Sequence, residues 1–117
     1  MCGRMTQTTD PSEIARIFDA ESTVETEDED ARPRYNVAPT QPLTVVLQRA
    51  EQGRLVEQHR WGLVPSFAKT LKDGAKRINA RAETVATSPS FRSSFRKRRC
   101  IVPSDGFYEW RRTGGPK

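Results

Sequence analysis

The chain has 117 residues, of which 34% are hydrophobic and 30% are charged, and its formal net charge is +5. This length supports one domain with a modest core and excludes a second one. No apolar run approaches the roughly 20 residues of a membrane span, and residues 1–4 do not begin a secretion signal. We therefore expect a single cytoplasmic, turn-rich domain over residues 1–117, with no membrane partner.

The charge is unevenly distributed along the chain. Residues 1–40 contain nine acidic and four basic side chains, a net of −5, which leaves +10 for residues 41–117. The basic excess is greatest at residues 92–99 and 111–117. Clustered Lys and Arg suit a polyanion such as nucleic acid, because each phosphate contact releases a counterion. A solvated face that keeps a small domain soluble is an equally weighted alternative.

The first third of the sequence predicts one helix. Asp10 and Pro11 are typical of a helix start, and apolar residues follow at helical spacing, so we expect a short helix over residues 11–20. Residues 21–34 are acidic and poor in apolar side chains, which predicts a surface loop. Residues 34–42 are bounded by prolines and should be extended.

The middle of the chain predicts a β-hairpin. β-Branched residues at 43–48, a Gly-containing turn and a partly alternating segment at 54–61 carry this prediction, with Trp61 in the core. Residues 71–76 predict a loop. Residues 77–84 are compatible with either a strand or a structured loop.

The last third predicts a helix and two strands. A Ser-Pro pair and two Phe residues one helical turn apart favour a helix at 88–96. Residues 100–103 and 106–110 read as strands around a turn. The whole pattern predicts an α+β fold that is mostly β with short helices. No later segment pairs with the aromatic strand, so we expect the N-terminal portion of a longer domain.

Cys2 offers the most specific chemistry. Removal of Met1 would leave an N-terminal cysteine whose amine and thiol stand on adjacent carbon atoms. An aldehyde is the matching electrophile, because the amine forms a Schiff base and the thiol then closes a five-membered thiazolidine. The alternative is a cysteine that simply packs. With no secretion signal, we expect Cys2 and Cys100 to be free thiols. A single His and the absence of a CxxC motif predict no metal site.

Four further residues are candidates for the same chemistry. Glu109, if half buried beside Phe107, would move the protons that both steps require. Asn79 could hold the sugar or the amine, and Arg81 could hold a phosphate. Phe67 could stack against a base. An outward-facing Glu, a turn Asn, a surface Arg and a core Phe are the respective alternatives.

Five segments in order resemble one family. They are MCGR at 1–4, RYNVAPTQ at 34–41, WGLVPS at 61–66, INARAET at 78–84 and RCIVPSDGFYEW at 99–110. Together they resemble the SRAP family of abasic-site processing proteins. The resemblance implies a barrel-like β domain that binds single-stranded DNA and traps the aldehyde of an abasic site as a thiazolidine. It also implies abasic-site lyase and autoproteolytic activity, a link to the SOS response, a cytoplasmic or nucleoid location and no cofactor.

The resemblance assigns roles to individual residues. It implies that Cys2 is the nucleophile, that Asn79 positions the reacting sugar and amine, and that Glu109 is the acid and base. The DNA-binding residues that it implies are Arg4, Asn36, Pro39, Phe67 and Arg81. Phe67 stands where the family often has a Trp that wedges against bases.

One feature of the family is missing from these 117 residues. The family has a catalytic histidine in the second half of a longer domain, and His59 does not match it. Two other functions stay open from the residues alone. One is a peptidase or amidohydrolase that uses the N-terminal Cys. The other is a non-catalytic module that binds single-stranded nucleic acid.

Overall fold

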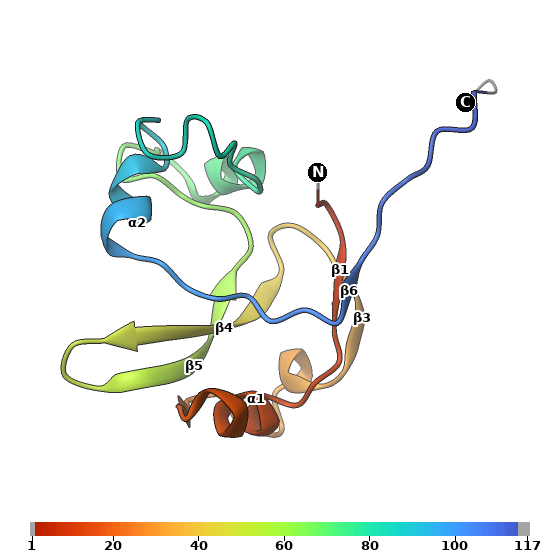
Figure 1. The fold of residues 1–117 in the computed structure, drawn as a ribbon, viewed down its shortest axis with the longest axis vertical. Coiled ribbons are helices and arrows are strands. Elements are labelled where there is room, and N and C mark those ends of the chain that lie inside the picture. The colour runs from red at the N-terminus through yellow and green to blue at the C-terminus, as the bar shows by residue number, and fades with distance from the viewer. Residues whose placement is uncertain (1, 115–117) are drawn as a thin grey trace.

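The computed structural model describes residues 2–114, in which the strands form two three-stranded sheets. In the first sheet, β1 (Met5–Gln7) lies between β3 (Arg34–Val37) and β6 (Gly106–Phe107) and is antiparallel to both. Figure 1 shows β1, in red, beside the blue β6, so the start of the chain is held by one of its last described segments. The register on β3 shifts between Met5 and Gln7, which marks an irregularity in this short ladder.

The second sheet contains the predicted hairpin. β4 (Pro42–Arg49) and β5 (Gly53–Arg60) pair along their whole length, and β2 (Glu21–Ser22) adds to β5 in parallel. Gly53 has a φ of 73°, the left-handed conformation that a tight turn at this position requires. The mostly β fold with short helices is therefore confirmed. The strands of residues 2–114 form no closed barrel.

The helices are short, and one of them covers the hairpin (Figure 1). α1 (Pro11–Phe18) begins where the Asp10 carboxylate accepts a hydrogen bond from the Ser12 amide, and it ends at Asp19, whose φ is 51°. The remaining helices are η1 (Glu29–Ala31), η2 (Leu71–Lys76) and α2 (Arg92–Lys97). No helix in the described part of the chain is long and apolar enough to cross a membrane.

Strand β4 contributes to two separate hydrophobic clusters. Val45 and Val46 point to opposite faces because successive side chains of a strand alternate. On one face the buried cluster is Met5, Val37, Leu43, Val45 and Trp61. On the other face it is Ile14, Ala15, Val46 and Val56, which fixes α1 against the hairpin. The predicted core position of Trp61 is confirmed, since its side chain is 7% exposed.

Two expected strands are much shorter than predicted. Over residues 100–103 only Ile101 pairs, forming one bridge with Val46 in which each amide donates to the other residue's carbonyl at 2.8 Å. Pro103 has no amide to extend a ladder, and its carbonyl accepts from the Gln7 side chain instead. Over residues 106–110 the strand stops after Phe107.

Other boundaries also differ from the sequence expectation. The acidic segment 21–34 contains β2 and η1 rather than a loop alone, and η2 replaces the loop expected at 71–76. Residues 77–84 form no strand, which agrees with the structured-loop alternative. The helix expected at 88–96 begins only at Arg92, whose amide bonds to the Ser88 carbonyl in a preceding turn.

Candidate functional site

The strand pairing of β1 determines where the N-terminal residues lie. Met5 pairs with Phe107, and one step further the Tyr108 amide donates to the Arg4 carbonyl at 3.0 Å. This Tyr108–Arg4 bond lies one residue past the last pair of β6, and Glu109 is the next residue along the chain.

Asn79 contacts Cys2 directly. The Asn79 side-chain nitrogen Nδ2 donates to the Cys2 carbonyl at 2.7 Å. Cys2 is half-buried against the core cluster that contains Trp61, and its Sγ donates weakly to the Arg4 carbonyl at 3.8 Å. Contacts to the two preceding residues hold Asn79 in place. The Trp61 indole donates to the Ile78 carbonyl at 3.1 Å, and the Leu63 amide donates to the Arg77 carbonyl at 3.0 Å.

A close approach of two glycines brings the Asn79 segment to this position. Gly62 has a φ of 124°, and a Cβ atom there would lie 2.4 Å from the Gly74 carbonyl oxygen. A Cβ at Gly74 would lie 2.9 Å from the Val64 side chain. Only glycine allows the two backbones to approach this closely. Residues 77–79, which follow Gly74, then lie where they contact Trp61 and Cys2.

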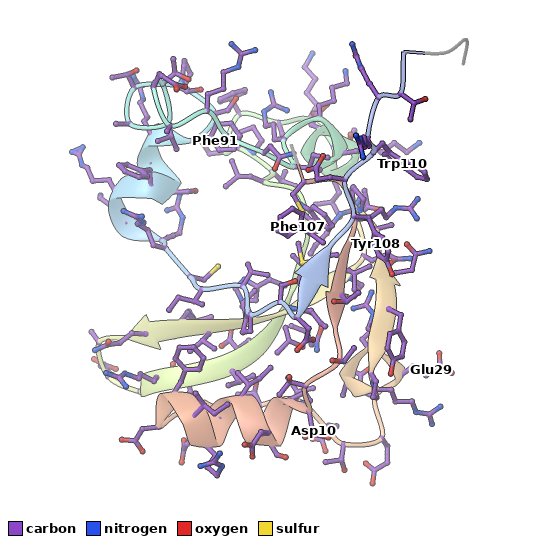
Figure 2. All side chains as sticks on the ribbon, turned by 45° about the vertical axis from the view of Figure 1, so that its right-hand side comes forward. Asp10, Glu29, Phe91, Phe107, Tyr108 and Trp110 are labelled. Atoms are coloured by element: carbon purple, nitrogen blue, oxygen red, sulfur yellow. The ribbon has the colours of Figure 1, made fainter. Side chains whose placement is uncertain are left out.

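Glu109 is exposed, so the half-buried position expected beside Phe107 is wrong. The strand ends at Phe107, which is itself 67% exposed. Tyr108 and Trp110, on either side of Glu109, are exposed as well. Figure 2 shows Phe107, Tyr108 and Trp110 along this segment. Tyr108 nevertheless spans the sheet, since its hydroxyl donates to the Tyr35 carbonyl on β3 at 2.7 Å.

Two of the predicted DNA-binding residues form a pair. The Arg4 guanidinium donates to the Asn36 side-chain oxygen at 2.9 Å, and both residues are exposed. The pair links the residue before β1 to the exposed face of β3. An oriented, exposed guanidinium is well suited to bind a phosphate oxygen.

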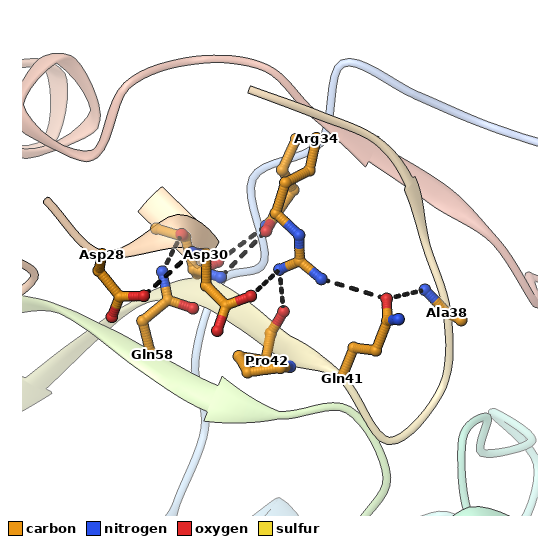
Figure 3. A network of polar contacts seen from close by, with 9 residues as sticks. Asp28, Asp30, Arg34, Ala38, Gln41, Pro42 and Gln58 are labelled. Atoms are coloured by element: carbon orange, nitrogen blue, oxygen red, sulfur yellow. Dashed lines mark hydrogen bonds and ion pairs between the residues drawn. The ribbon is translucent and has the colours of Figure 1, made fainter. Parts of the chain in front are cut away.

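Pro39 lies in the loop between β3 and β4, and Figure 3 shows what fixes this loop. The Arg34 guanidinium donates to the Pro42 carbonyl and to Gln41 Oε1, the latter at 3.2 Å. Gln41 Oε1 in turn accepts from the Ala38 amide at 2.9 Å. The loop therefore presents Pro39 on a braced backbone.

Phe67 and Arg81 lie further along the surface. Phe67 is 60% exposed, and the Arg77 guanidinium carbon lies 5.8 Å from its ring centroid. Arg77 is itself held by the Asp73 carbonyl at 2.8 Å and by Ser90 at 2.9 Å. Arg81 is exposed, two residues beyond Asn79. Hydrogen bonds thus join Cys2 to Asn79 and Arg4 to Asn36, and neither pair includes Phe67, Pro39 or Arg81.

Two positioning residues were not predicted from the sequence. Gln7 is buried, and its Nε2 donates to the Thr44 carbonyl at 2.9 Å and to the Pro103 carbonyl at 2.8 Å, while its Oε1 accepts from the Thr44 amide at 3.0 Å. Asp105 accepts from the Thr8 amide at 2.5 Å. These bonds tie β1 to the segment that leads to Glu109. A short polar strand carries no periodic signal that would reveal them.

Three further titratable residues, Glu57, His59 and Cys100, are not among the predicted site residues. His59 bonds to Glu57 at 2.7 Å, and this bond together with the Arg49 guanidinium holds the pKa of the Glu57 carboxyl below its usual value. Both cysteines are free, as expected, and burial raises the pKa of the Cys100 thiol. Residues 2–114 contain no group of three or more His, Cys, Asp or Glu side chains that could hold a metal ion.

Comparison with known proteins places this geometry in a family. The family model described as SOS response associated peptidase (SRAP) matches residues 1–117. The chain is 42% identical over 112 residues to the abasic site processing protein YoqW of Bacillus subtilis, covering 96% of this chain and 49% of the relative. It is 37% identical over 97 residues to the abasic site processing protein HMCES of Gallus gallus, covering 74% of this chain and 29% of the relative.

A crystal structure of a Bacteroides thetaiotaomicron protein superposes with a TM-score of 0.78 at 28% identity, covering 98% of this chain and 51% of that one. A second, from Bordetella bronchiseptica, has the same fold, with a TM-score of 0.69 at 24% identity over 92% of this chain and 50% of that one. The chain spans about half the length of the bacterial relatives it matches. The family model and the relatives together show that the chain belongs to the SRAP family.

Proposed function

We propose that this chain processes abasic sites in single-stranded DNA, and that Cys2, once Met1 is removed, forms the covalent bond to the damaged sugar. The names of the relatives support abasic-site DNA as the target. The hydrogen bond from Asn79 to the Cys2 carbonyl is the observation that carries the proposal, because it orients the residue that would bear both nucleophiles. The function belongs to the DNA damage response, in the cytoplasm or on the nucleoid.

The proposed reaction proceeds in two steps. The Cys2 amine attacks the C1′ aldehyde of the ring-opened sugar, and the resulting carbinolamine loses water to give a Schiff base. The Cys2 thiolate then adds to the imine carbon and closes a thiazolidine, while the ring nitrogen takes up a proton. No bond of the DNA backbone breaks. Because both nucleophiles belong to one residue, the second step is intramolecular and is strongly favoured.

Glu109 would carry the protons in both steps. Loss of water from the carbinolamine needs an acid, and attack by the thiol needs a base. Glu109 follows Tyr108, whose amide bonds to the Arg4 carbonyl two residues after Cys2, and this proximity in the chain supports the assignment. The exposure of Glu109 leaves room for the DNA strand to approach the same place.

The surrounding polar residues would hold the DNA. The Arg4–Asn36 pair and Arg81 would contact phosphates on either side of the abasic sugar. Phe67, with Arg77 against its ring, would stack on a neighbouring base, and Pro39 would pack beside the strand on its braced loop. A lyase side reaction would start from the Schiff base, when a base removes a C2′ proton and the 3′ phosphate leaves. The SRAP link to autoproteolysis and to the SOS response belongs to the same proposal.

The experiment uses the protein with Met1 removed and an oligonucleotide that carries one abasic site. We expect an adduct that survives heat and detergent and that migrates as a protein–DNA band on a denaturing gel. Cys2→Ala should abolish this band, whereas Cys100→Ala should leave it intact. Cys2→Ser retains the amine and should give only a Schiff base, which needs borohydride to be trapped.

Two outcomes would contradict the proposal. One is an adduct that forms equally well on DNA whose abasic aldehyde was first reduced to the alcohol. The other is unchanged adduct formation by Cys2→Ala. The peptidase alternative makes a different prediction, namely an acyl-enzyme on Cys2 with amide substrates and no dependence on an aldehyde.

A further inference from the structure

α2 carries a concentration of positive charge that the proposed reaction does not use. All four residues at 96–99, at the end of α2 and just after it, are basic. Arg92 lies one helical turn before Arg96. All five basic residues are exposed. Within residues 2–114, none of them forms an ion pair with an acidic side chain.

These side chains surround a concave surface rather than a flat one. A cavity of about 400 Å³ is lined by Ala86, Arg92, Ser93, Phe95, Arg96 and Lys97. Three cationic side chains and one aromatic ring therefore face the same space. Arg98 is occupied with Ser93 and Ser94, to whose hydroxyls its guanidinium donates at 3.1 and 3.3 Å.

The exposed ring of Phe95 indicates which class of anionic ligand the cavity would bind. Its side chain is 36% exposed, although a Phe on a small helix would normally be buried. The Arg99 guanidinium carbon lies 4.4 Å from the ring centroid, so the ring is held in place by a cation. A fixed ring beside several cations is the combination that binds single-stranded nucleic acid, in which the bases are free to stack.

The cavity is separate from Cys2 but connected to it by a short piece of chain. Figure 1 shows α2 to one side of the molecule, away from the end of β1. The connecting segment runs from Asn79, which contacts Cys2, to Ala86, which lines the cavity. Seven residues span at most about 25 Å when fully extended.

We propose that the α2 cavity is a second binding site for single-stranded DNA, in which Arg92, Arg96 and Lys97 hold phosphates and Phe95 stacks on a base. It would take a part of the same strand that lies within about 25 Å of Asn79. This inference rests on the proposed function only in taking DNA as the ligand. It does not require the Cys2 chemistry.

The test measures non-covalent binding in a Cys2→Ala background, so that failure of the covalent reaction cannot affect it. The probe is a fluorescently labelled oligothymidine of about 20 nucleotides without any abasic site, titrated at several salt concentrations by anisotropy. Arg96→Ala/Lys97→Ala should reduce the slope of log K against log salt by about 1.4, because each single-strand phosphate contact contributes about 0.7. At about 0.1 M salt the affinity should fall on the order of tenfold.

A matched variant controls for net charge. Arg16→Ala/Arg32→Ala also removes two positive charges, from α1 and from the segment before β3, and should leave the slope unchanged. Phe95→Leu should weaken binding of the oligothymidine about fivefold or more with the slope unchanged, because it removes stacking and no charge.

The proposal is overturned if the α2 double variant and the Arg16/Arg32 control lose the same slope, since the effect would then be one of overall charge. It is also overturned if Phe95→Leu binds as the parent does, or if the α2 variants weaken binding to anionic lipid vesicles but not to the oligothymidine. Because all three α2 residues to be changed are exposed, equal melting temperatures are expected for parent and variants.

Discussion

The side chain of Asn79 donates a hydrogen bond to the backbone carbonyl of Cys2 across 77 positions of sequence. Because the acceptor is a backbone atom, this contact orients the residue as a whole and does not consume its thiol or its amine. Asn79 is exposed, so its contribution to the stability of the fold is small compared with its effect on Cys2.

Asn79→Asp should therefore slow adduct formation without unfolding the protein. The substitution keeps the size of the side chain but removes both N–H donors, so the Cys2 carbonyl loses its partner. Loss of one such bond corresponds to about a fivefold slower reaction. Single-turnover kinetics on abasic DNA measure the rate, and circular dichroism reports the fold. An unchanged rate would mean that the contact has no positioning role.

Gln7 should matter for stability more than any exposed polar residue of β4. Gln7→Ala leaves the amide and carbonyl of Thr44 and the carbonyl of Pro103 without their partner inside the protein. We expect the free energy of unfolding to fall by about 2–4 kcal/mol. Urea denaturation measures it. Gln48→Ala, at an exposed position of β4, is the control and should change it by less than about 0.5 kcal/mol.

Asp105 should make stability depend on pH in the acid range. The Thr8 amide, followed by the Thr8 hydroxyl, lowers the pKa of the Asp105 carboxyl below its usual value. A lowered pKa in the folded state means that the stabilisation is fully present above the unfolded value of about 3.9 and is lost as the pH falls through the folded value. Asp105→Asn should lower the melting temperature at pH 7, and the gap should close in acid.

Thr8→Val is the companion to this pH experiment. It removes the hydroxyl donor and leaves the Thr8 amide in place, so the pH dependence should be smaller than in the wild type but larger than in Asp105→Asn. Thermal unfolding at a series of pH values gives all three curves. A gap between wild type and Asp105→Asn that stays constant with pH would show that the hydrogen bonds to Thr8 do not favour the ionised carboxyl.

Gly62→Ala should be strongly destabilising, and Gly53→Ala only moderately so. Both residues have a positive φ, which costs an alanine about 1 kcal/mol. Only at Gly62 would the new methyl group also collide with a backbone carbonyl, that of Gly74, whereas nothing lies within 4 Å at Gly53. We expect a loss of about 3 kcal/mol or more at Gly62. Equal losses at the two positions would remove the close approach as an explanation.

The elements that the sequence predicts correctly are those that depend only on residues close together in the chain. The α1 start needs only Asp10 and the residues after it, and the hairpin is visible in its own β-branched residues and turn. β1 and β6 have three and two residues, which is too short for any periodicity to register. Both depend on pairing with distant segments: β1 and β6 pair with each other across about 100 positions, and β1 also pairs with β3.

The same distinction applies to the candidate site. Cys2, Asn79 and Glu109 could be chosen for their chemistry and for their place in motifs. Their geometry could not, because it depends on the Gly62–Gly74 approach and on the buried side chain of Gln7. Glu109 is exposed rather than half-buried for a related reason. The sequence predicts a strand over 106–110, but the strand in the structure ends at Phe107.

The placement of β1 between β3 and β6 has a consequence for the order of events during synthesis. A ribosome adds about 5–20 residues per second, so the residues of β6 are made roughly 5–20 s after those of β1. Until then one edge of β1 has no neighbour. Pairing of β1 on both of its edges therefore waits for the translation of residues 8–105.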